Sequence, residues 1–387
     1  MESKKTDHEV IIVGAGPVGL CTALALARAG RQVLVLEKNP TTHDHSRAPA
    51  IWPRTQEILD GLGVLEDFLE NGIRHETVTL WDGDQNPPKP VISFPLKELS
   101  SRTKHTQLLI LPQSETERLL YEALLKHSNA SLLFNTEVEE IFQTEEHVKV
   151  RFQKEGKTIE PTGLFLVGAD GAHSVVRKAL GFSLEGETYP MNAVLADVKF
   201  PGTDFAFSPR FSTKDFLCLA IQIRKEVWRL ILPFEEKNSA SVEARIHHSV
   251  KNLFQVSSPE IIWKSEFHLH RRMSTGLLKG RCVLAGDAAH LNSPVGGEGM
   301  NSGIQDTEIL SRCLIEALNE NSPAPLEEYV RQRRPASGKV NRFTHFMTMA
   351  LMATHGRGIK GVLQALRLIL KIRPLRKKFL LKIAMFD

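Results

Sequence analysis

Residues 9–37 constrain the fold more than any other segment of this chain. Residues 9–13 form a short apolar run rich in β-branched side chains, which predicts a buried parallel strand. Three glycines follow, residues 20–29 then have the composition of a helix, and Gly30 ends that helix. Residues 32–36 predict a second strand, closed by Glu37. Strand, glycine turn, helix, strand and acid in this order predict an α/β domain with a dinucleotide-binding turn.

Each residue type in this turn has a physical role. Gly14 permits a tight turn, Gly16 lets the backbone approach a pyrophosphate, and Gly19 lets the helix pack closely on the strand. The helix N-terminus offers free amides and a positive dipole end. Glu37 can accept hydrogen bonds from ribose and disfavours a 2′-phosphate, so FAD or NAD fits better than NADP. The alternative is a glycine-rich turn without a ligand. The candidate cofactor-binding residues here are Gly14, Gly16, Pro17, Val18, Gly19, Glu37 and Lys38.

Two later motifs complete the pattern. Residues 164–167 predict a strand, and Gly-Ala-Asp-Gly-Ala-His-Ser-Val-Val-Arg follows at 168–177. Residues 281–285 predict another strand, and Ala-Gly-Asp-Ala-Ala-His at 285–290 leads into Pro-Val-Gly-Gly-Glu-Gly-Met-Asn at 294–301. Asp287 can accept hydrogen bonds from ribityl hydroxyls, and the later glycines let the backbone pass close to a flat ring. The helix predicted for residues 300–317 would point its positive end at that ring. The three motifs therefore predict one bound FAD, held first at its adenosine end.

Taken together, the motifs resemble those of the class A flavoprotein aromatic hydroxylases, which include p-hydroxybenzoate hydroxylases and single-component polyketide hydroxylases. The resemblance covers the chain to about residue 350. It implies that Asp170 lies near the pyrophosphate and that His290 has a structural or pyrophosphate-side role. His173 and Arg177 are candidate contacts of NAD(P)H, with a local structural role as an equal alternative. The further cofactor-binding candidates are Arg47, Gln113, Asp170, Asp287, Pro294, Gly297, Gly299, Met300 and Asn301.

The predicted fold class is α/β: a Rossmann-like FAD-binding domain with a parallel sheet and a β-meander, a middle β-sheet substrate domain, and C-terminal helices. We expect a discontinuous FAD-binding domain formed by residues 1–70, 101–180 and 275–350. Residues 71–100 and 181–274 are expected to form the substrate-binding sheet, and residues 351–387 basic C-terminal helices. An aromatic cluster could line the substrate pocket, although such residues are more often sheet core. Its members are Phe205, Phe207, Phe211 and Phe216.

The resemblance implies a single-component FAD-dependent monooxygenase that uses NADPH or NADH as a transient electron donor. In that family, reduced flavin and O2 form a C4a-hydroperoxide, which hydroxylates an electron-rich aromatic or polyketide-like small molecule. Epoxidation and Baeyer–Villiger insertion stay open. No side chain is needed as a nucleophile, and Tyr189 is the candidate base for a substrate phenol. The alternatives are an FAD-dependent reductase of an isoprenoid- or quinone-like substrate and a flavin-binding protein without turnover.

Composition excludes other classes. A net charge of +4, spread along the chain except at its end, does not favour nucleic acid. The four cysteines have no metal or redox spacing, which indicates reduced thiols in a cytoplasmic protein. We expect no metal site, because the alternating His268 and His270 lack a third ligand. Neither the N-terminus nor any later segment has the apolar run of a signal peptide or membrane span. A monomer is expected, since the thioredoxin-like domain of larger phenol hydroxylases does not follow.

The tail from residue 355 to 387 is both basic and apolar. One interpretation is an amphipathic segment in weak contact with an anionic membrane surface. The favoured interpretation is a pair of helices packed on the FAD-binding domain, with lysines and arginines extending outward. Pro374 is predicted to divide the segment into two short helices.

Overall fold

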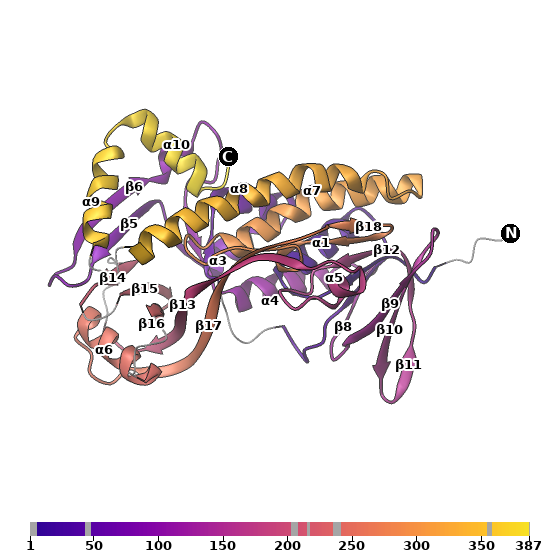
Figure 1. The fold of residues 1–387 in the computed structure, drawn as a ribbon, viewed down its shortest axis with the longest axis horizontal. Coiled ribbons are helices and arrows are strands. Elements are labelled where there is room, and N and C mark those ends of the chain that lie inside the picture. The colour runs from indigo at the N-terminus through magenta and orange to yellow at the C-terminus, as the bar shows by residue number, and fades with distance from the viewer. Residues whose placement is uncertain are drawn as a thin grey trace.

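The structure is a computed structural model that describes residues 6–42, 48–202, 208–214, 217–234, 241–353 and 358–386. Two large sheets and a layer of long helices make up this part of the chain (Figure 1). The observed mixture of parallel and antiparallel sheets with covering helices confirms the predicted α/β fold class.

The nine-stranded sheet contains the strand that precedes each motif. Its main path runs β11-β10-β12-β1-β2-β8, with β9 beside β10 and β19 between β12 and β18. Strands β8, β2, β1, β12 and β19 are parallel, and the remaining strands form the antiparallel meander and an edge hairpin. The strands are β1 (His8–Val13), β2 (Val33–Leu36), β8 (Ala130–Leu133), β9 (Val138–Gln143), β10 (Val148–Lys154), β11 (Lys157–Ile159), β12 (Thr162–Gly168), β18 (Leu278–Lys279) and β19 (Cys282–Leu284).

Strand β1 is buried on both faces, as its continuous apolar run predicts. Val10 and Ile12 pack into a core shared with the long helices, whereas Ile11 and Val13 pack into a second core against the meander. The helices in this part of the chain are α1 (Pro17–Arg28), α2 (Pro53–Gly61), α3 (Leu65–Asn71), α4 (Gln113–Leu124), α5 (Val175–Ala179), α7 (Glu298–Glu320) and α8 (Leu326–Ala353). Helices α1 and α7 pack side by side against this sheet, which places both N-termini near the end of β1.

The eight-stranded sheet has the order β20-β17-β13-β16-β15-β14-β5-β6. Helix α6 (Val242–Phe254) covers one face, where Trp228 and Leu230 form a core with Ile246. The strands are β5 (Thr77–Asp82), β6 (Lys89–Pro95), β13 (Leu184–Lys199), β14 (Arg210–Ser212), β15 (Cys218–Arg224), β16 (Val227–Phe234), β17 (Glu260–Ser274) and β20 (His290–Leu291). A third, small sheet contains β3 (Ala50–Ile51), β7 (Leu108–Ile110) and β4 (Ile73–His75), and the 3-10 turns are η1 (Leu96–Leu99) and η3 (Gly286–Ala288). The strands of each large sheet come from several separate segments of the chain, and the domain boundaries predicted from the sequence stay a proposal.

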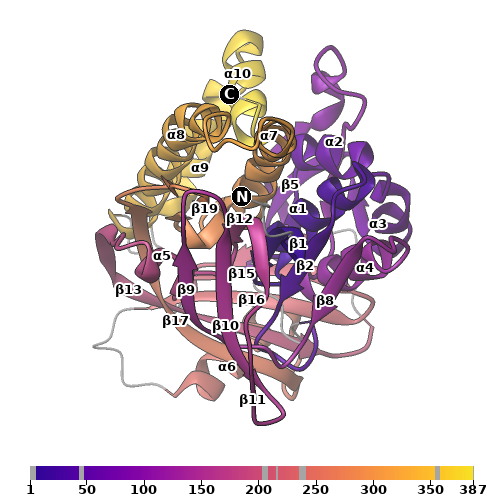
Figure 2. The ribbon, with the colours of Figure 1, turned by 90° about the vertical axis from the view of Figure 1, so that its right-hand side faces the viewer.

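The C-terminal segment forms α9 (Ile359–Ile369) and α10 (Arg373–Ile383), separated just before Pro374. In both views α10 lies near the top of the picture and α6 near the bottom (Figure 1 and Figure 2). Helix α10 buries Leu380, and Arg376 pairs with Glu98 at 2.8 Å. Helix α9 has no fully buried residue. No helix in the described ranges is long and apolar enough to cross a membrane.

Candidate functional site

The strand register brings the three motifs to one edge of the nine-stranded sheet. Val13 at the end of β1 pairs with Leu36 of β2 and with Gly168 of β12, and Gly168 pairs in turn with Leu284 of β19. The residues that follow these strand ends therefore lie at the same level. They include Gly14, Glu37, Asp170 and Asp287. Ligands of open α/β sheets bind at such a carboxyl edge.

The first glycine turn is closed by packing at two positions and open at the third. Gly14 has φ +103°, and a Cβ there would lie 2.4 Å from the carbonyl oxygen of Ala169. A Cβ at Gly19 would lie 1.9 Å from the carbonyl oxygen of Gly14, so neither position accepts a side chain. A Cβ at Gly16 would meet no described atom within 4 Å, and Gly16 begins α1 without a described side-chain cap. This open turn in front of uncapped amides fits a pyrophosphate.

Val18 and Pro17 have local roles in the same turn. Pro17 occupies the first turn of α1, where its missing N–H costs no hydrogen bond. The Val18 side chain fits against two glycines, because a Cβ at Gly286 or Gly303 would lie 2.8 or 2.6 Å from it. These glycines let α1, α7 and the Asp287 turn approach one another closely.

Glu37 is buried and tied to the glycine turn. Its Oε2 accepts a hydrogen bond from the Ala15 amide at 2.8 Å, and its Oε1 accepts from the backbone and side chain of Asn39 at 3.0 and 2.6 Å. Each carboxylate oxygen can accept more than one hydrogen bond, so Oε2 keeps capacity for a ribose hydroxyl. The neighbouring Lys38 is exposed.

Asp170 combines a structural hydrogen-bond set with an unpartnered oxygen. Its Oδ2 accepts from the amides of Val175 and Val176 at 2.7 and 3.2 Å, at the start of α5. Its Oδ1 is buried and has no hydrogen-bond partner among the described residues. Burial raises the pKa of Asp170, with hydrogen bonds to Ser174 and nearby amides acting in the opposite direction. A buried acceptor without a partner at this edge fits a ligand that donates hydrogen bonds.

The two candidate NAD(P)H contacts differ in exposure. His173 is exposed, and its role stays a prediction. Arg177 is 5% exposed, and its guanidinium donates to the carbonyl oxygens of Ala288 at 3.1 Å and Ala172 at 2.8 Å. These bonds join the second motif to the third, which favours the structural alternative for Arg177.

Asp306 holds the Asp287 turn in place. Its Oδ2 accepts from the Gly286 amide at 2.9 Å and lies 2.8 Å from Nε2 of His290, and its Oδ1 accepts from Arg333 at 2.7 Å. Burial alone would raise the pKa of Asp306, but the charges of His290 and Arg333 and these hydrogen bonds lower it to about 2. Asp287 itself is exposed between buried neighbours. The contact with Asp306 favours the structural alternative for His290, and the contacts add Asp306 and Arg333, which the sequence did not single out.

The turn before α7 is fixed by side chains from another segment. Gly296 and Gly297 have φ +97° and +67°, values that glycine adopts readily. Asn301 accepts a hydrogen bond from the Trp52 amide at 3.0 Å and donates to the carbonyl oxygens of Ala50 and Gly297, both at 2.8 Å. The Trp52 indole donates to the Gly296 carbonyl oxygen at 3.2 Å. Sequence reasoning missed Trp52, because these partners lie more than 200 residues apart.

The candidate ring-binding backbone is accessible in front of this turn. Pro294 is exposed, and Gly297, Gly299 and Met300 are half-buried. A Cβ at Gly299 would meet no described atom within 4 Å. Helix α7 has no described side-chain cap, so its first amides and its positive dipole end are available to a planar anionic group.

The remaining residues predicted to contact FAD or the substrate lie partly within and partly outside the described residues. Gln113 begins α4 and donates to Glu117 at 2.9 Å. Arg47 lies outside the described residues, as do Phe205, Phe207 and Phe216. Phe211 is buried.

Tyr189 lies on β13 and is 4% exposed. Its hydroxyl is 2.8 Å from Nδ1 of His345, and the two rings stack with centroids 5.8 Å apart. Burial raises the pKa of Tyr189, which disfavours the phenolate that a base would need. The geometry therefore gives little support to Tyr189 as a base.

The eight-stranded sheet offers an apolar face opposite α6. Leu195, Ile231 and Leu219 are cross-strand neighbours on β13, β16 and β15. Ile231 and Leu219 are only half-buried, unlike the buried residues that alternate with them. Ile221, on the same face as Leu219, packs into the core that contains Trp52. This apolar face (Leu195, Leu219 and Ile231) therefore lies on the side of the sheet that packs against the core containing Trp52.

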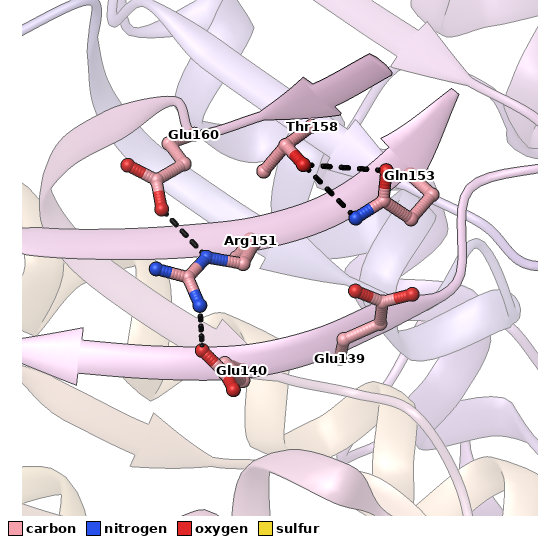
Figure 3. A pocket seen from close by; sticks show the side chains of 6 residues that line it. All are labelled: Glu139, Glu140, Arg151, Gln153, Thr158 and Glu160. Atoms are coloured by element: carbon pink, nitrogen blue, oxygen red, sulfur yellow. Dashed lines mark hydrogen bonds and ion pairs between the residues drawn. The ribbon is translucent and has the colours of Figure 1, made fainter. Parts of the chain in front are cut away.

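A separate hollow lies on the meander and contains no motif residue. Figure 3 shows that Arg151 pairs there with Glu140 and Glu160, while Gln153 bonds to Thr158. Of its charged groups, Arg151, Glu140 and Glu160 are paired with one another. Within the described ranges, no three His, Cys, Asp or Glu side chains gather as a metal site would require, and the rings of His268 and His270 are 6.3 Å apart.

Comparisons with known proteins bear on the family of this chain. Residues 7–344 match the family described as "FAD binding domain". Para-nitrophenol 4-monooxygenase of Pseudomonas sp. (strain WBC-3) is 30% identical over 334 residues, which cover 84% of this chain and 82% of that protein. Pentachlorophenol 4-monooxygenase of Sphingobium chlorophenolicum is 28% identical over 375 residues, covering 92% of this chain and 67% of that protein.

A solved structure has the same overall fold as this chain. The crystal structure of p-nitrophenol 4-monooxygenase from Pseudomonas putida DLL-E4 superimposes with a TM-score of 0.89 at 26% sequence identity. The match covers 99% of this chain and 98% of that one.

Proposed function

The chain belongs to the FAD-binding family of flavin-dependent aromatic hydroxylases, and on that premise we propose that it adds one oxygen atom from O2 to a substituted phenol. It is a single-component, FAD-dependent monooxygenase, with NADPH or NADH as the electron donor. The observation that carries the proposal is the alignment of the three motif turns at one sheet edge, in front of two uncapped helix N-termini.

FAD, when bound, supplies the redox and oxygen chemistry. We assign its pyrophosphate to the open turn at Gly16, its ribose to Glu37 and its ribityl chain to Asp287. The amides at the start of α7 stabilise negative charge on the ring system. The apolar face of the eight-stranded sheet would exclude water from the reacting groups. His173 is proposed as a contact of the nicotinamide donor, and Gln113 and Arg47 as further contacts of FAD.

The substrate class follows from the apolar face and from the relatives. Leu195, Leu219 and Ile231 offer apolar contacts to a ring, and Arg229, buried on the same sheet, is neutralised by Asp197 at 2.8 Å. The two relatives described above are named for a nitrophenol and a chlorophenol, whereas other relatives are named for tetracycline precursors. We therefore propose an uncharged, single-ring phenol rather than a larger polyketide.

NAD(P)H oxidation tests this function. The purified protein is assayed in air against phenols, quinolones and polyketides, with peroxide and product both quantified. The expected result is a phenol that accelerates oxidation and is recovered with one added oxygen. Acceleration that persists without O2 would favour a reductase, and bound FAD that no compound causes to turn over would favour a flavin-binding protein.

The C-terminal helices support a proposal about partners. Five large apolar side chains there are 45–62% exposed: Val362, Leu368, Ile369, Ile372 and Leu375. Residues 358–386 contain eight lysines and arginines and no acidic residue. We propose that this surface makes weak contact with anionic lipid, since both its apolar and its basic groups match that partner.

Vesicle sedimentation tests the lipid contact. The protein should sediment with phosphatidylglycerol vesicles and not with phosphatidylcholine vesicles, and the double variant Leu368→Ser, Ile372→Ser should lose sedimentation. Light scattering decides between lipid and a second copy of the chain. We propose a monomer, and a dimer that the double variant dissociates would assign the surface to self-association. A cytoplasmic location is likewise proposed, in keeping with four buried, free cysteines.

A further inference from the structure

Glu298 is a buried carboxyl at the helix end that we assign to the flavin ring. It is the first residue of α7 and is 1% exposed. Its Oε1 has no hydrogen-bond partner among the described residues. A Cβ built at Gly296 would lie 3.5 Å from that oxygen, so the carboxyl packs directly against the turn that precedes the helix. A carboxyl oxygen left without a partner at this depth is costly, which calls for an explanation.

The surrounding charges leave Glu298 largely uncompensated. Lys382 of α10 is the cation that acts on it, although that ammonium also lies 4.3 Å from the centroid of the Phe343 ring. Arg54 of α2 pairs with Glu57 at 2.9 Å and with Glu308. Asp306, farther along α7, is paired with His290 and with Arg333 of α8. Burial raises the pKa of Glu298 to about 8 despite Lys382, so the carboxyl holds a proton through much of the neutral range.

The N-terminus of α7 also lies where the negative charge of a reduced flavin would develop. Hydride transfer from NAD(P)H delivers two electrons and one proton, which leaves a bound flavin with one added negative charge. The α7 dipole stabilises that charge, whereas an ionised carboxylate on the first residue of α7 would oppose it.

We propose that Glu298 is a positioning residue that takes up one proton from solvent when the bound flavin is reduced and releases it on reoxidation. The helix end then faces one negative charge instead of two. This inference rests on the proposed function, because it requires FAD at the start of α7.

The midpoint potential of bound FAD, measured anaerobically from pH 6 to 10, tests the proposal. The midpoint potential of a two-electron couple that takes up one proton falls by about 30 mV per pH unit. Uptake of a second proton doubles that slope. The wild-type protein should show the doubled slope above the pKa of Glu298, and Glu298→Gln should show the single slope throughout. Glu320→Gln makes the same chemical change at the exposed far end of α7 and should behave as wild type.

Proton uptake by the wild-type protein gives a second readout that needs no variant. Reduction by NAD(P)H alone takes no proton from solution, because the hydride carries its own. With Glu298 acting as proposed, a pH indicator in weak buffer should register uptake approaching one proton per FAD at alkaline pH. Equal slopes in wild type and Glu298→Gln, or reduction without uptake, would overturn this inference and leave the monooxygenase intact. Failure to bind FAD at all would overturn both.

Discussion

At the scale of single residues, the site is built mainly by side chains that hold backbone turns in place. Glu37 bonds to the first glycine turn, Asp306 to the Asp287 turn, and Asn301 to the turn before α7. Each turn then presents amides or an acidic side chain toward the same edge. The loss of Asp306, which supports a turn and is not assigned to FAD, should therefore weaken cofactor binding without removing a direct contact.

Asp306→Asn tests this at the most buried position. The variant leaves Arg333 and His290 without their acid, and we expect a loss of roughly 3 kcal/mol in the free energy of unfolding at pH 7. Because the pKa of Asp306 is lowered to about 2, its contribution is present above the ordinary value of 3.8 and is lost as pH falls toward 2. Urea unfolding should show the difference between wild type and variant shrinking below pH 4. A difference that does not depend on pH would contradict this account of Asp306.

Gly16→Ala tests the open turn. A methyl group there meets no described atom, so the unliganded protein should keep its Tm. It would occupy the space assigned to the pyrophosphate, and the Kd for FAD should rise at least about tenfold, which corresponds to about 1.4 kcal/mol. Gly61→Ala, another glycine with free space around it, is the matched control. Equal FAD affinity of both variants would show that the pyrophosphate does not bind at this turn.

Glu298→Gln has an expected effect on stability as well. A raised pKa means that the cost of the buried carboxylate is absent below its ordinary value of 4.5 and grows until the pH passes about 8. The variant should therefore gain stability relative to wild type as pH rises through this window. Chemical denaturation of the FAD-free proteins at pH 5 and pH 9 measures the change, and a constant difference would show that Glu298 is not buried as described.

At the scale of elements, the sequence predicted what depends on local pattern. The apolar run of residues 9–13, the glycine spacing and the periodicity of residues 300–317 predicted β1, α1 and α7, because strand and helix periods are local properties. The contacts of Trp52 with Gly296 and of Arg333 with Asp306 were not predictable in this way. They depend on how distant elements pack, and neither residue belongs to a motif with a known spacing. The sequence placed Glu298 within the third motif, but it could not show that the side chain is buried with an unpartnered oxygen.

The sheet face opposite α6 allows a test at this scale. Ile231→Phe should enlarge a side chain on the apolar face and raise the KM for a bulky phenol more than for a small one. Ile262→Phe changes an exposed position on β17 and should leave both values unchanged. Steady-state kinetics with two phenols of different size make the comparison. Parallel changes in both variants would show that this face does not line the substrate site.

At the scale of the whole molecule, two sheets share one set of connecting elements. The Asp287 turn follows β19 of the nine-stranded sheet. Strand β20 comes directly after this turn and joins the eight-stranded sheet by pairing with β17. Helix α7 begins a few residues later and packs beside α1. The segment to which we assign the ribityl and ring positions therefore connects the nine-stranded sheet to the eight-stranded sheet.

Isotope labelling tests the central claim most directly. The FAD-loaded protein is supplied with NAD(P)H, a phenol that stimulates oxidation, and 18O-labelled O2, and the product is analysed by mass spectrometry. The account predicts a hydroxylated product that carries one 18O atom, with unlabelled O2 giving the unlabelled product. A product whose new oxygen comes from water, or oxidation that proceeds equally without O2, would contradict it.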